Sequence, residues 1–139
     1  PFAIGKAELY FVPKEGVEVM VAILATGSLV HNALKAAKAL EEKGIGAKVW
    51  NFATVKPIDE EAVLEAAGIG AIVTVEEHQQ KGGFGSAVAE YLAQNKPTKQ
   101  AFIGVKDVFG QSGTQTELIE HYEMGISHIM LAAERVIQR

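Results

Sequence analysis

The segment Val73-Thr-Val-Glu-Glu-His-Gln-Gln-Lys-Gly-Gly-Phe-Gly85 decides the fold, because it joins a strand to a helix through a polar loop. Residues Ala71–Val75 are mostly apolar and β-branched, which is the composition of a strand buried on both faces of a sheet. Three glycines end the loop, and Ser86–Gln94 then has helical spacing. In an open α/β sheet, functional groups gather at the carboxyl end of such a strand.

The rest of the chain alternates strands with helices. Four further strands are expected, at Ala7–Val12, Val19–Ala25, Lys48–Phe52 and Ala101–Val105. The second of these is apolar throughout, which favours a central position in the sheet. This alternation predicts an α/β fold with a doubly wound, mostly parallel sheet, in a single domain that spans residues 1–139.

Capping residues predict where the first two helices begin and end. Ser28 is expected to cap a helix whose apolar face includes Leu40 and whose end is marked by Gly44. Asp59 is expected to cap the next helix, with acidic residues in its first turn, and Gly68 to end it.

Two separate helices are expected near the carboxyl terminus. Thr114 and Glu117 have the spacing of a capping box, which predicts a helix that runs to Tyr122. Ser127 is expected to cap the final helix, with Ile126 packed against Leu131 as a hydrophobic staple.

Composition excludes several classes of function. The chain has 139 residues, 48% of them hydrophobic, a net charge of −4 and no cysteine. An acidic balance disfavours nucleic acid and anionic membranes as partners, and no apolar run reaches the ~20 residues of a membrane span. The absence of cysteine excludes disulfides and thiol chemistry and favours a cytoplasmic protein. The chain begins with Pro1 rather than methionine, which suggests a fragment of a longer chain.

The glycine turn before the helix at residue 86 has two interpretations. It could cradle a phosphate, because free backbone N–H groups and the helix dipole attract anions. However, Glu76 and Glu77 lie directly upstream and would repel an anion, and the spacing lacks the third glycine of a dinucleotide fingerprint. Close packing of the backbone is therefore the favoured explanation of these glycines.

The polar residues of the two strand exits form no recognisable catalytic or metal site. Glu76 and Glu77 should point to opposite faces of the sheet, so they form no carboxylate dyad. His78 could act in acid–base chemistry, but an interface hydrogen bond is the favoured role. No histidine has another ligand at metal spacing, and no Ser-His-Asp arrangement can be assembled. Asn51 and residues 54–59 form a second polar strand exit. These patterns indicate a binding or scaffold domain.

Five blocks of sequence together resemble the C-terminal domain of transketolase, and they follow one another along nearly the whole chain. The blocks are Ile4–Ala7, Ile23–Ser28, Thr54–Asp59, Val75–His78 with Gly82–Ser86, and Phe109–Gly113 followed by Leu118 and Tyr122. The resemblance implies a three-layer α/β/α sandwich with a mixed, mostly parallel five-stranded sheet, whose first strand is antiparallel to the rest.

The resemblance also implies an activity for the whole enzyme. A transketolase transfers a two-carbon ketol unit between sugar phosphates with thiamine diphosphate and a divalent metal such as Mg²⁺. In that family the first two domains of opposing subunits hold these cofactors, and their motifs are missing from this chain. The isolated chain is therefore expected to be inactive, with no catalytic, cofactor-binding or metal-binding residue. Its expected partners are the cofactor-binding domains of the same enzyme, and the full enzyme is expected to be a homodimer. Neither nucleic acid nor a membrane is expected as a partner.

The carboxyl edge of the sheet is the expected contact surface, and Glu77 or His78 is expected to hydrogen-bond across it. The alternative role for these residues is local capping and turn formation. The candidate interface residues are Asn51, Thr54, Lys56, Asp59, Glu76, Glu77, His78, Gly82, Gly83, Gly85 and Ser86.

Other functions remain open at this point. Similar last domains occur in deoxyxylulose-phosphate synthase and in the beta subunits of 2-oxo acid dehydrogenases. A freestanding module that binds a small anion or nucleotide is a further alternative.

Overall fold

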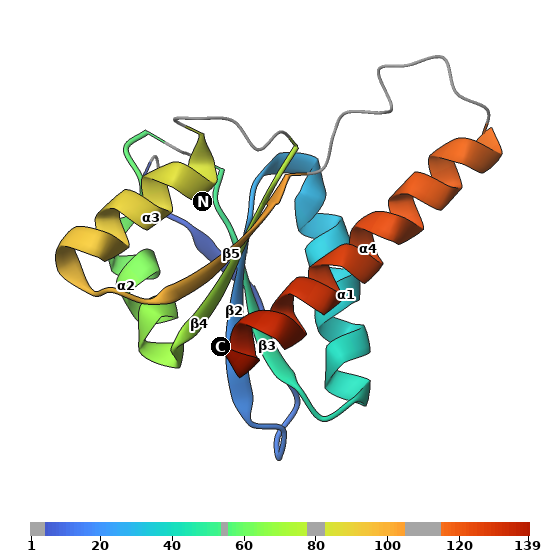
Figure 1. Ribbon diagram of the computed structural model, residues 1–139, viewed down its shortest axis with the longest axis horizontal. Helices are drawn as coiled ribbons and strands as arrows, with labels where there is room; N and C mark the ends of the chain where they lie inside the picture. Colours follow the sequence, from blue (N-terminus) through green and yellow to red (C-terminus); the bar gives the residue numbers. More distant parts are fainter. Residues whose placement is uncertain (1–4, 54–55, 78–82, 105–114) are drawn as a thin grey trace.

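The computed structural model describes residues 5–53, 56–77, 83–104 and 115–139, and in the last of these segments it describes side chains from Gly125 onward. Five strands form one sheet in the order β1-β3-β2-β4-β5 (Figure 1). β1 is antiparallel to β3, and the other neighbours are parallel, as expected. The strands are β1 Glu8–Phe11, β2 Val19–Ala25, β3 Gly46–Asn51, β4 Ala71–Glu76 and β5 Lys99–Gly104.

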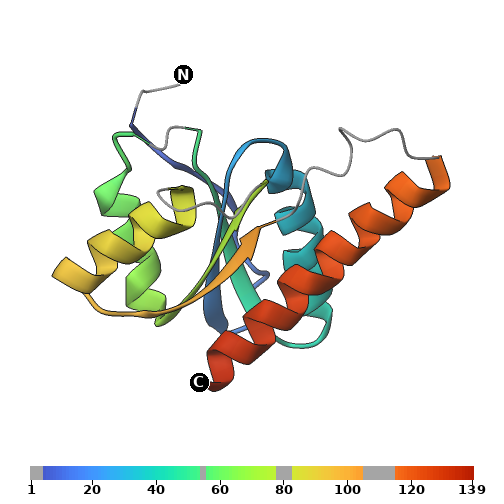
Figure 2. The same ribbon diagram turned by 45° about the horizontal axis from the view of Figure 1, so that its top comes forward.

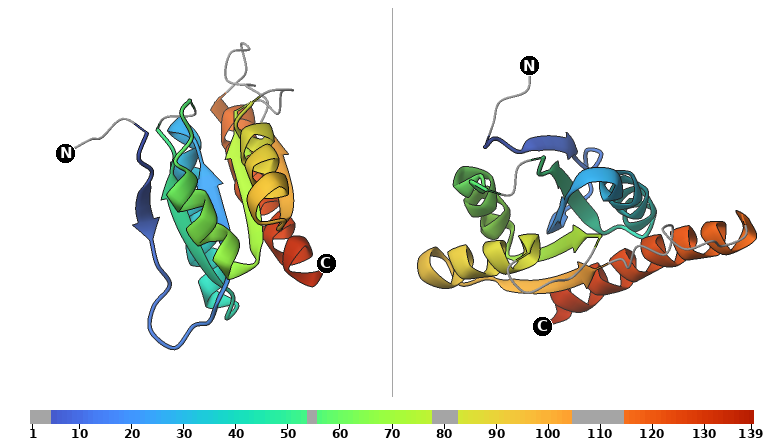
Figure 3. Two further views of the ribbon diagram at one scale, coloured as in Figure 1. Left: turned by 90° about the vertical axis from the view of Figure 1, so that its left-hand side faces the viewer. Right: turned by 90° about the horizontal axis from the view of Figure 1, so that it is seen from above.

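Helices cover both faces of the sheet and complete the expected three layers. One face packs against α1 (Val30–Glu42) and α4 (Gln115–Gln138), and the other packs against α2 (Glu60–Ile69) and α3 (Phe84–Asn95) (Figure 3). A short 3₁₀ helix, η1 (Gly27–Leu29), precedes α1.

Successive residues of the central strands fill two separate cores. Ile23 of β2 and Val73 of β4 lie in the core under α1 and α4. Leu24 and Ile72 lie in the core under α2 and α3. This alternation follows from the period of two along a strand, and it explains why both strands need apolar residues at consecutive positions. β4 is buried at every position, which its composition predicted for Ala71–Val75.

The ends of α1 and α2 are set by glycines with positive φ. Gly44 has φ +80 and donates its N–H to Glu41 O at 2.9 Å, while Ile45 donates to Leu40 O at 3.0 Å. This is a Schellman motif, which confirms Gly44 as the C′ residue. The prediction that Gly68 ends α2 is wrong. The helix continues to Ile69, and Gly70 with φ +105 ends it, because the stop requires the left-handed conformation that Gly70 adopts.

α4 is one continuous helix, so the prediction of two helices is wrong. Gly125 is buried, and a Cβ added there would lie 3.2 Å from Asn32 Nδ2 of α1. Gly125 therefore permits close packing of α4 on α1, and it does not interrupt α4. Ser127 is exposed within α4 and is not a cap. The expected staple is also absent, because Ile126 packs on the core whereas Leu131 is exposed. The predicted caps Thr114 and Glu117 have no described side chains.

The end of α4 is held at the amino edge of the sheet, where β5 begins. Lys99 Nζ donates to the carbonyl oxygens of Ile137 at 3.0 Å and Arg139 at 2.8 Å. A lysine suits this position because the C-terminal carbonyls of a helix carry partial negative charge. In return, the Arg139 guanidinium donates to Gln100 O at 3.3 Å. Figure 2 shows the C-terminus at this end of the sheet.

Candidate functional site

The described ends of β2, β3 and β4, after which the candidate residues follow, lie together at the carboxyl edge of the sheet, because these strands are parallel. β2 lies between the other two strands, so the exits of β3 and β4 lie on either side of it. Backbone hydrogen bonds join the three exits, from Thr26 N to Val75 O at 3.1 Å and from Phe52 N to Ala25 O at 2.9 Å. The helices that follow β2 and β4 lie on opposite faces, which makes this the topological switch point of the sheet.

Glu76 turns inward and caps α3 with its carboxylate. Its side chain is buried, with 9% of the residue exposed. Oε1 accepts a hydrogen bond from Phe84 N at 3.2 Å, and Oε2 accepts one from Gly85 N at 2.8 Å. These are two of the N–H groups that a helix leaves unpaired at its start. The chain's own carboxylate thus fills the position that a phosphate would occupy at the start of α3.

Gly85, the second residue of α3, permits close packing, as favoured above for the glycines of this turn. A Cβ on Gly85 would lie 2.7 Å from the ring of Phe102, and 3.0 Å from both Glu76 Oε2 and Thr74 Oγ1. Gly83 is the N-cap residue of α3 and contributes no side-chain hydrogen bond. Ser86 is the third residue of α3, which begins two residues earlier than its predicted start.

Glu77 points to solvent, so the predicted divergence of the two glutamates is confirmed. Its Oε1 accepts a hydrogen bond from Ser28 Oγ at 3.1 Å. The prediction that Ser28 caps the first helix is wrong, because Ser28 lies inside η1 and α1 has no side-chain cap. The Ser28 hydroxyl instead links the exits of β2 and β4.

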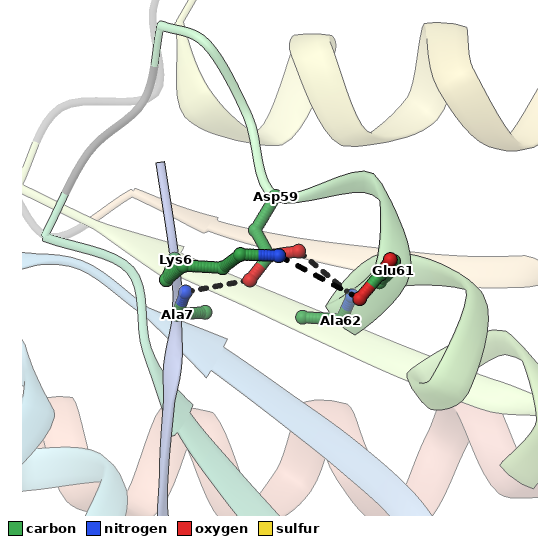
Figure 4. A network of polar contacts seen from close by, with 5 residues as sticks. All are labelled: Lys6, Ala7, Asp59, Glu61 and Ala62. Carbon is green, nitrogen blue, oxygen red and sulfur yellow. Dashed lines mark hydrogen bonds and ion pairs between the residues drawn. The ribbon is translucent and has the colours of Figure 1, made fainter. Parts of the chain in front are cut away.

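Asp59 joins the start of the described chain to α2 (Figure 4). Its Oδ1 accepts a hydrogen bond from Ala62 N at 3.1 Å, which confirms it as the N-cap. Its Oδ2 accepts one from Ala7 N at 2.7 Å, and only 8% of the residue is exposed. Beside it, Lys6 and Glu61 form an ion pair of 3.6 Å between exposed side chains. Because β1 runs antiparallel, the chain enters the sheet at the same edge where the parallel strands end.

The remaining candidates lie near the exit of β3. Asn51 Nδ2 donates to the hydroxyl oxygen of Tyr10 at 3.2 Å, which connects β3 to β1. Lys56 is exposed and precedes Pro57 through a cis peptide bond. Thr54, His78 and Gly82 lie outside the described residues.

The buried carboxylates of the described edge accept hydrogen bonds from the backbone of the chain itself. No group of three or more His, Cys, Asp or Glu side chains among the described residues could hold a metal ion. Asp59 and Glu76, the two buried acidic residues there, are both engaged with backbone N–H groups. Within the described part of the chain, no helix is long and apolar enough to cross a membrane.

Sequence reasoning identified both glutamates but missed the cap that Glu76 makes. The only signal is an acidic residue at the end of a buried strand, eight residues before the first residue of a helix. The Asn51–Tyr10 hydrogen bond was also missed, because it depends on the register between β1 and β3.

Comparisons with known proteins agree with this fold. A family model described as transketolase, C-terminal domain, matches residues 12–129. The 6-deoxy-6-sulfo-D-fructose transketolase subunit of Clostridium sp. (strain MSTE9) is 46% identical over 139 residues, covering 99% of this chain and 42% of that protein. The 1-deoxy-D-xylulose-5-phosphate synthase 1 of Geobacter sulfurreducens is 45% identical over 116 residues, covering 81% of this chain and 18% of that protein.

A solved structure, described as a split gene transketolase in an inactive beta4 tetramer, superposes with a TM-score of 0.79 at 42% identity. The match covers 99% of this chain and 44% of that chain, so the chain spans less than half the length of these relatives. By its family match and by these relatives, the chain belongs to the transketolase C-terminal domain family.

Proposed function

We propose that this chain is the C-terminal section of a transketolase-type enzyme, which transfers a two-carbon ketol unit between sugar phosphates. In this proposal the section contributes contacts to the cofactor-binding sections and no catalytic group. One observation supports the proposal that this section has no catalytic group. At the carboxyl edge, both Asp59 and Glu76 already accept hydrogen bonds from the chain's own backbone. Such an edge presents a preformed surface rather than a reactive centre.

The cofactors implied for the whole enzyme are thiamine diphosphate and Mg²⁺, and the described residues of this chain do not fit them. A diphosphate requires free N–H groups or cations, yet at the start of α3 a carboxylate occupies two N–H groups. Mg²⁺ requires a cluster of oxygen ligands, and the described residues contain no suitable group. We therefore assign cofactor binding to the other sections and no reaction step to this chain.

The test is reconstitution of ketol transfer. The chain alone, with thiamine diphosphate, Mg²⁺ and sugar phosphates, should show no transfer. Addition of the cofactor-binding section of a transketolase from the same organism should give a stable complex with activity. Ketol transfer by the chain alone, or the absence of any complex with that section, would overturn the proposal.

A second candidate, synthesis of 1-deoxy-D-xylulose 5-phosphate, is supported by the 45% identity to the Geobacter synthase. Analysis of the products of the reconstituted complex separates the two. Interchange of two-carbon units among sugar phosphates supports the first proposal, and accumulation of 1-deoxy-D-xylulose 5-phosphate supports the second.

A further inference from the structure

β5 stands last in the strand order and pairs with β4, so its other side is an edge of the sheet. Gln100 O points away from β4, because it accepts a hydrogen bond from the Arg139 guanidinium at 3.3 Å. Backbone groups alternate between the two sides of a strand, so Phe102 and Gly104 also turn theirs outward. No described residue bonds to the outward groups of Phe102. We call the backbone from Phe102 to Gly104 the free β5 edge.

The two halves of β5 differ in their protection against the addition of another strand. Charged side chains and covering segments are the usual means of blocking a sheet edge. The first half of β5 has both, because Arg139 bonds to Gln100 O and the end of α4 lies against Lys99. The three residues of the free β5 edge include neither a charged residue nor a proline. Strand addition is therefore blocked at the start of β5 and not at its end.

The two faces of the sheet differ in chemistry beside the free β5 edge. On the face that α3 covers, Phe102 is 37% exposed and its ring lies close to Gly85. The residues that alternate with Phe102, Ala101 and Ile103, point to the opposite face and pack in the core under α4. A strand added here would therefore have an exposed aromatic ring beside it on one face and α4 beside it on the other.

α4 packs against β5 (Figure 3) and carries basic residues on the side toward the free β5 edge. Arg139 reaches Gln100 O, which identifies the side of the helix that faces this edge. Arg135 and His128 lie four and eleven residues earlier and are exposed, so the helical period places them on the same side. Glu134, the one acidic residue among the described side chains of α4, instead pairs with α1 at 2.6 Å.

We infer that the free β5 edge binds an extended segment of a partner protein in which apolar and acidic side chains alternate. Successive side chains of an added strand point to opposite faces of the sheet. The apolar ones would contact Phe102, and the acidic ones would lie beside Arg135 and His128 of α4. In strand addition, backbone hydrogen bonds supply affinity and the alternating side chains supply specificity.

A second copy of this chain fits the free β5 edge poorly. Its own β5, Lys99–Gly104, contains no acidic residue. Antiparallel pairing of two β5 strands about a twofold axis would also bring the basic sides of the two α4 helices together, and like charges oppose such pairing. The inference goes beyond the proposed function and does not depend on it, because strand addition engages the side of β5 rather than the strand exits.

The experiment uses a short peptide with the inferred pattern, acetyl-Val-Glu-Val-Glu-Val-Glu-amide, titrated into the whole chain and followed by amide NMR. The control peptide, acetyl-Val-Lys-Val-Lys-Val-Lys-amide, has the same backbone and the opposite charge. Hydrogen exchange is measured in parallel for the outward amides of Phe102 and Gly104 and for the inward amides of Ala101 and Ile103, which point to β4.

We expect the Val-Glu peptide to bind with a dissociation constant of about 1 mM, since only a short segment is paired. Binding should shift the amide signals of Phe102 and Gly104 and slow their exchange. Exchange at Ala101 and Ile103 should stay unchanged, because these amides are already paired with β4. The Val-Lys peptide should bind at least fivefold more weakly.

Three variants test the side chains that the inference invokes. Arg135→Glu should weaken binding of the Val-Glu peptide by about fivefold, because repulsion replaces an exposed ion pair. Lys38→Glu makes an equal change of charge on the exposed face of α1, and it should alter the dissociation constant less than twofold. Phe102→Thr removes the ring but keeps a residue that favours strands, and it should also weaken binding. The melting temperature of each variant shows whether the fold is kept.

Three results would overturn the inference: no saturable shift at Phe102 up to about 10 mM peptide, equal binding of the two peptides, or equal weakening by Arg135→Glu and Lys38→Glu. Slowed exchange at Phe102 that increases with protein concentration in the absence of peptide would show that a second copy occupies the edge, and the inference would again be wrong. None of these results bears on the proposed function, which the reconstitution of ketol transfer tests separately.

Discussion

Replacement of Glu76 by glutamine tests whether its carboxylate holds the start of α3. The two oxygens of Glu76 accept the N–H groups of Phe84 and Gly85 at 3.2 and 2.8 Å in a buried position. Glutamine keeps one acceptor oxygen and turns an N–H₂ group toward the other backbone N–H. One hydrogen bond to a charged group is lost, one buried N–H is left unpaired, and the charge that complements the helix dipole disappears.

The expected loss of stability is large for a change of so few atoms. A hydrogen bond to a charged acceptor contributes about 1.5–3 kcal/mol, and an unpaired buried N–H costs about 1–3 kcal/mol. Because these effects overlap, we expect Glu76→Gln to lower the free energy of unfolding by about 2–4 kcal/mol. For a chain of this size the melting temperature should then fall by about 5–15 °C.

The matched control is Glu77→Gln at the neighbouring position. Glu77 is exposed and accepts the Ser28 hydroxyl at 3.1 Å, so the same chemical change should cost about 0.5 kcal/mol or less. Urea unfolding followed by circular dichroism measures both variants, and hydrogen exchange reports on the amides of Phe84 and Gly85. These two amides should exchange faster in Glu76→Gln only. Equal stability of the two variants would show that the Glu76 carboxylate is not the cap that the structure describes.

Two further predictions concern Asp59 and α4. Asp59→Ala removes the acceptors of both Ala62 N and Ala7 N, so the free energy of unfolding should fall by about 2–3 kcal/mol. Trypsin should also cleave faster after Lys6, because Ala7 is no longer held. The control Glu60→Ala, in the same helical turn, should have little effect on either measurement. Cleavage after Lys6 at the wild-type rate would contradict the role of Asp59 in holding this segment. Ser127→Ala should stabilise the protein by about 0.5 kcal/mol in thermal unfolding, because alanine favours a helix interior, whereas removal of an N-cap would destabilise it by ~1 kcal/mol. A fall in melting temperature would therefore argue for a helix break at this serine.

The central strands were predictable because burial on both faces of the sheet requires apolar residues at consecutive positions. β4 has apolar or β-branched residues from Ala71 to Val75, and the structure buries all of them. The parallel direction of the central strands could be inferred from the alternation of strands and helices. The antiparallel β1 was implied only by the family resemblance, since the direction of an edge strand leaves no periodic signal.

The errors arose where tertiary packing overrides a local signal. Ser127 has the character of an N-cap, yet it lies inside α4, which passes close to Asn32 of α1 at Gly125. Gly68 looks like a helix stop, but the helix ends at Gly70, and only the backbone conformation distinguishes the two. The period of a strand predicted that Glu76 and Glu77 diverge. It could not predict which of them turns inward, because that depends on where α3 begins.

The Lys99 contacts at the end of α4 have a practical consequence for work on this protein. They fix Arg139 at the amino edge of the sheet, whereas the contact surface proposed for the cofactor-binding sections lies at the opposite edge. An affinity tag, a fluorophore or a surface attachment joined after Arg139 would therefore project away from the carboxyl edge. Immobilisation through that end should leave binding at the carboxyl edge unaffected. A fusion placed before Lys6 would lie close to that edge and could obstruct a partner.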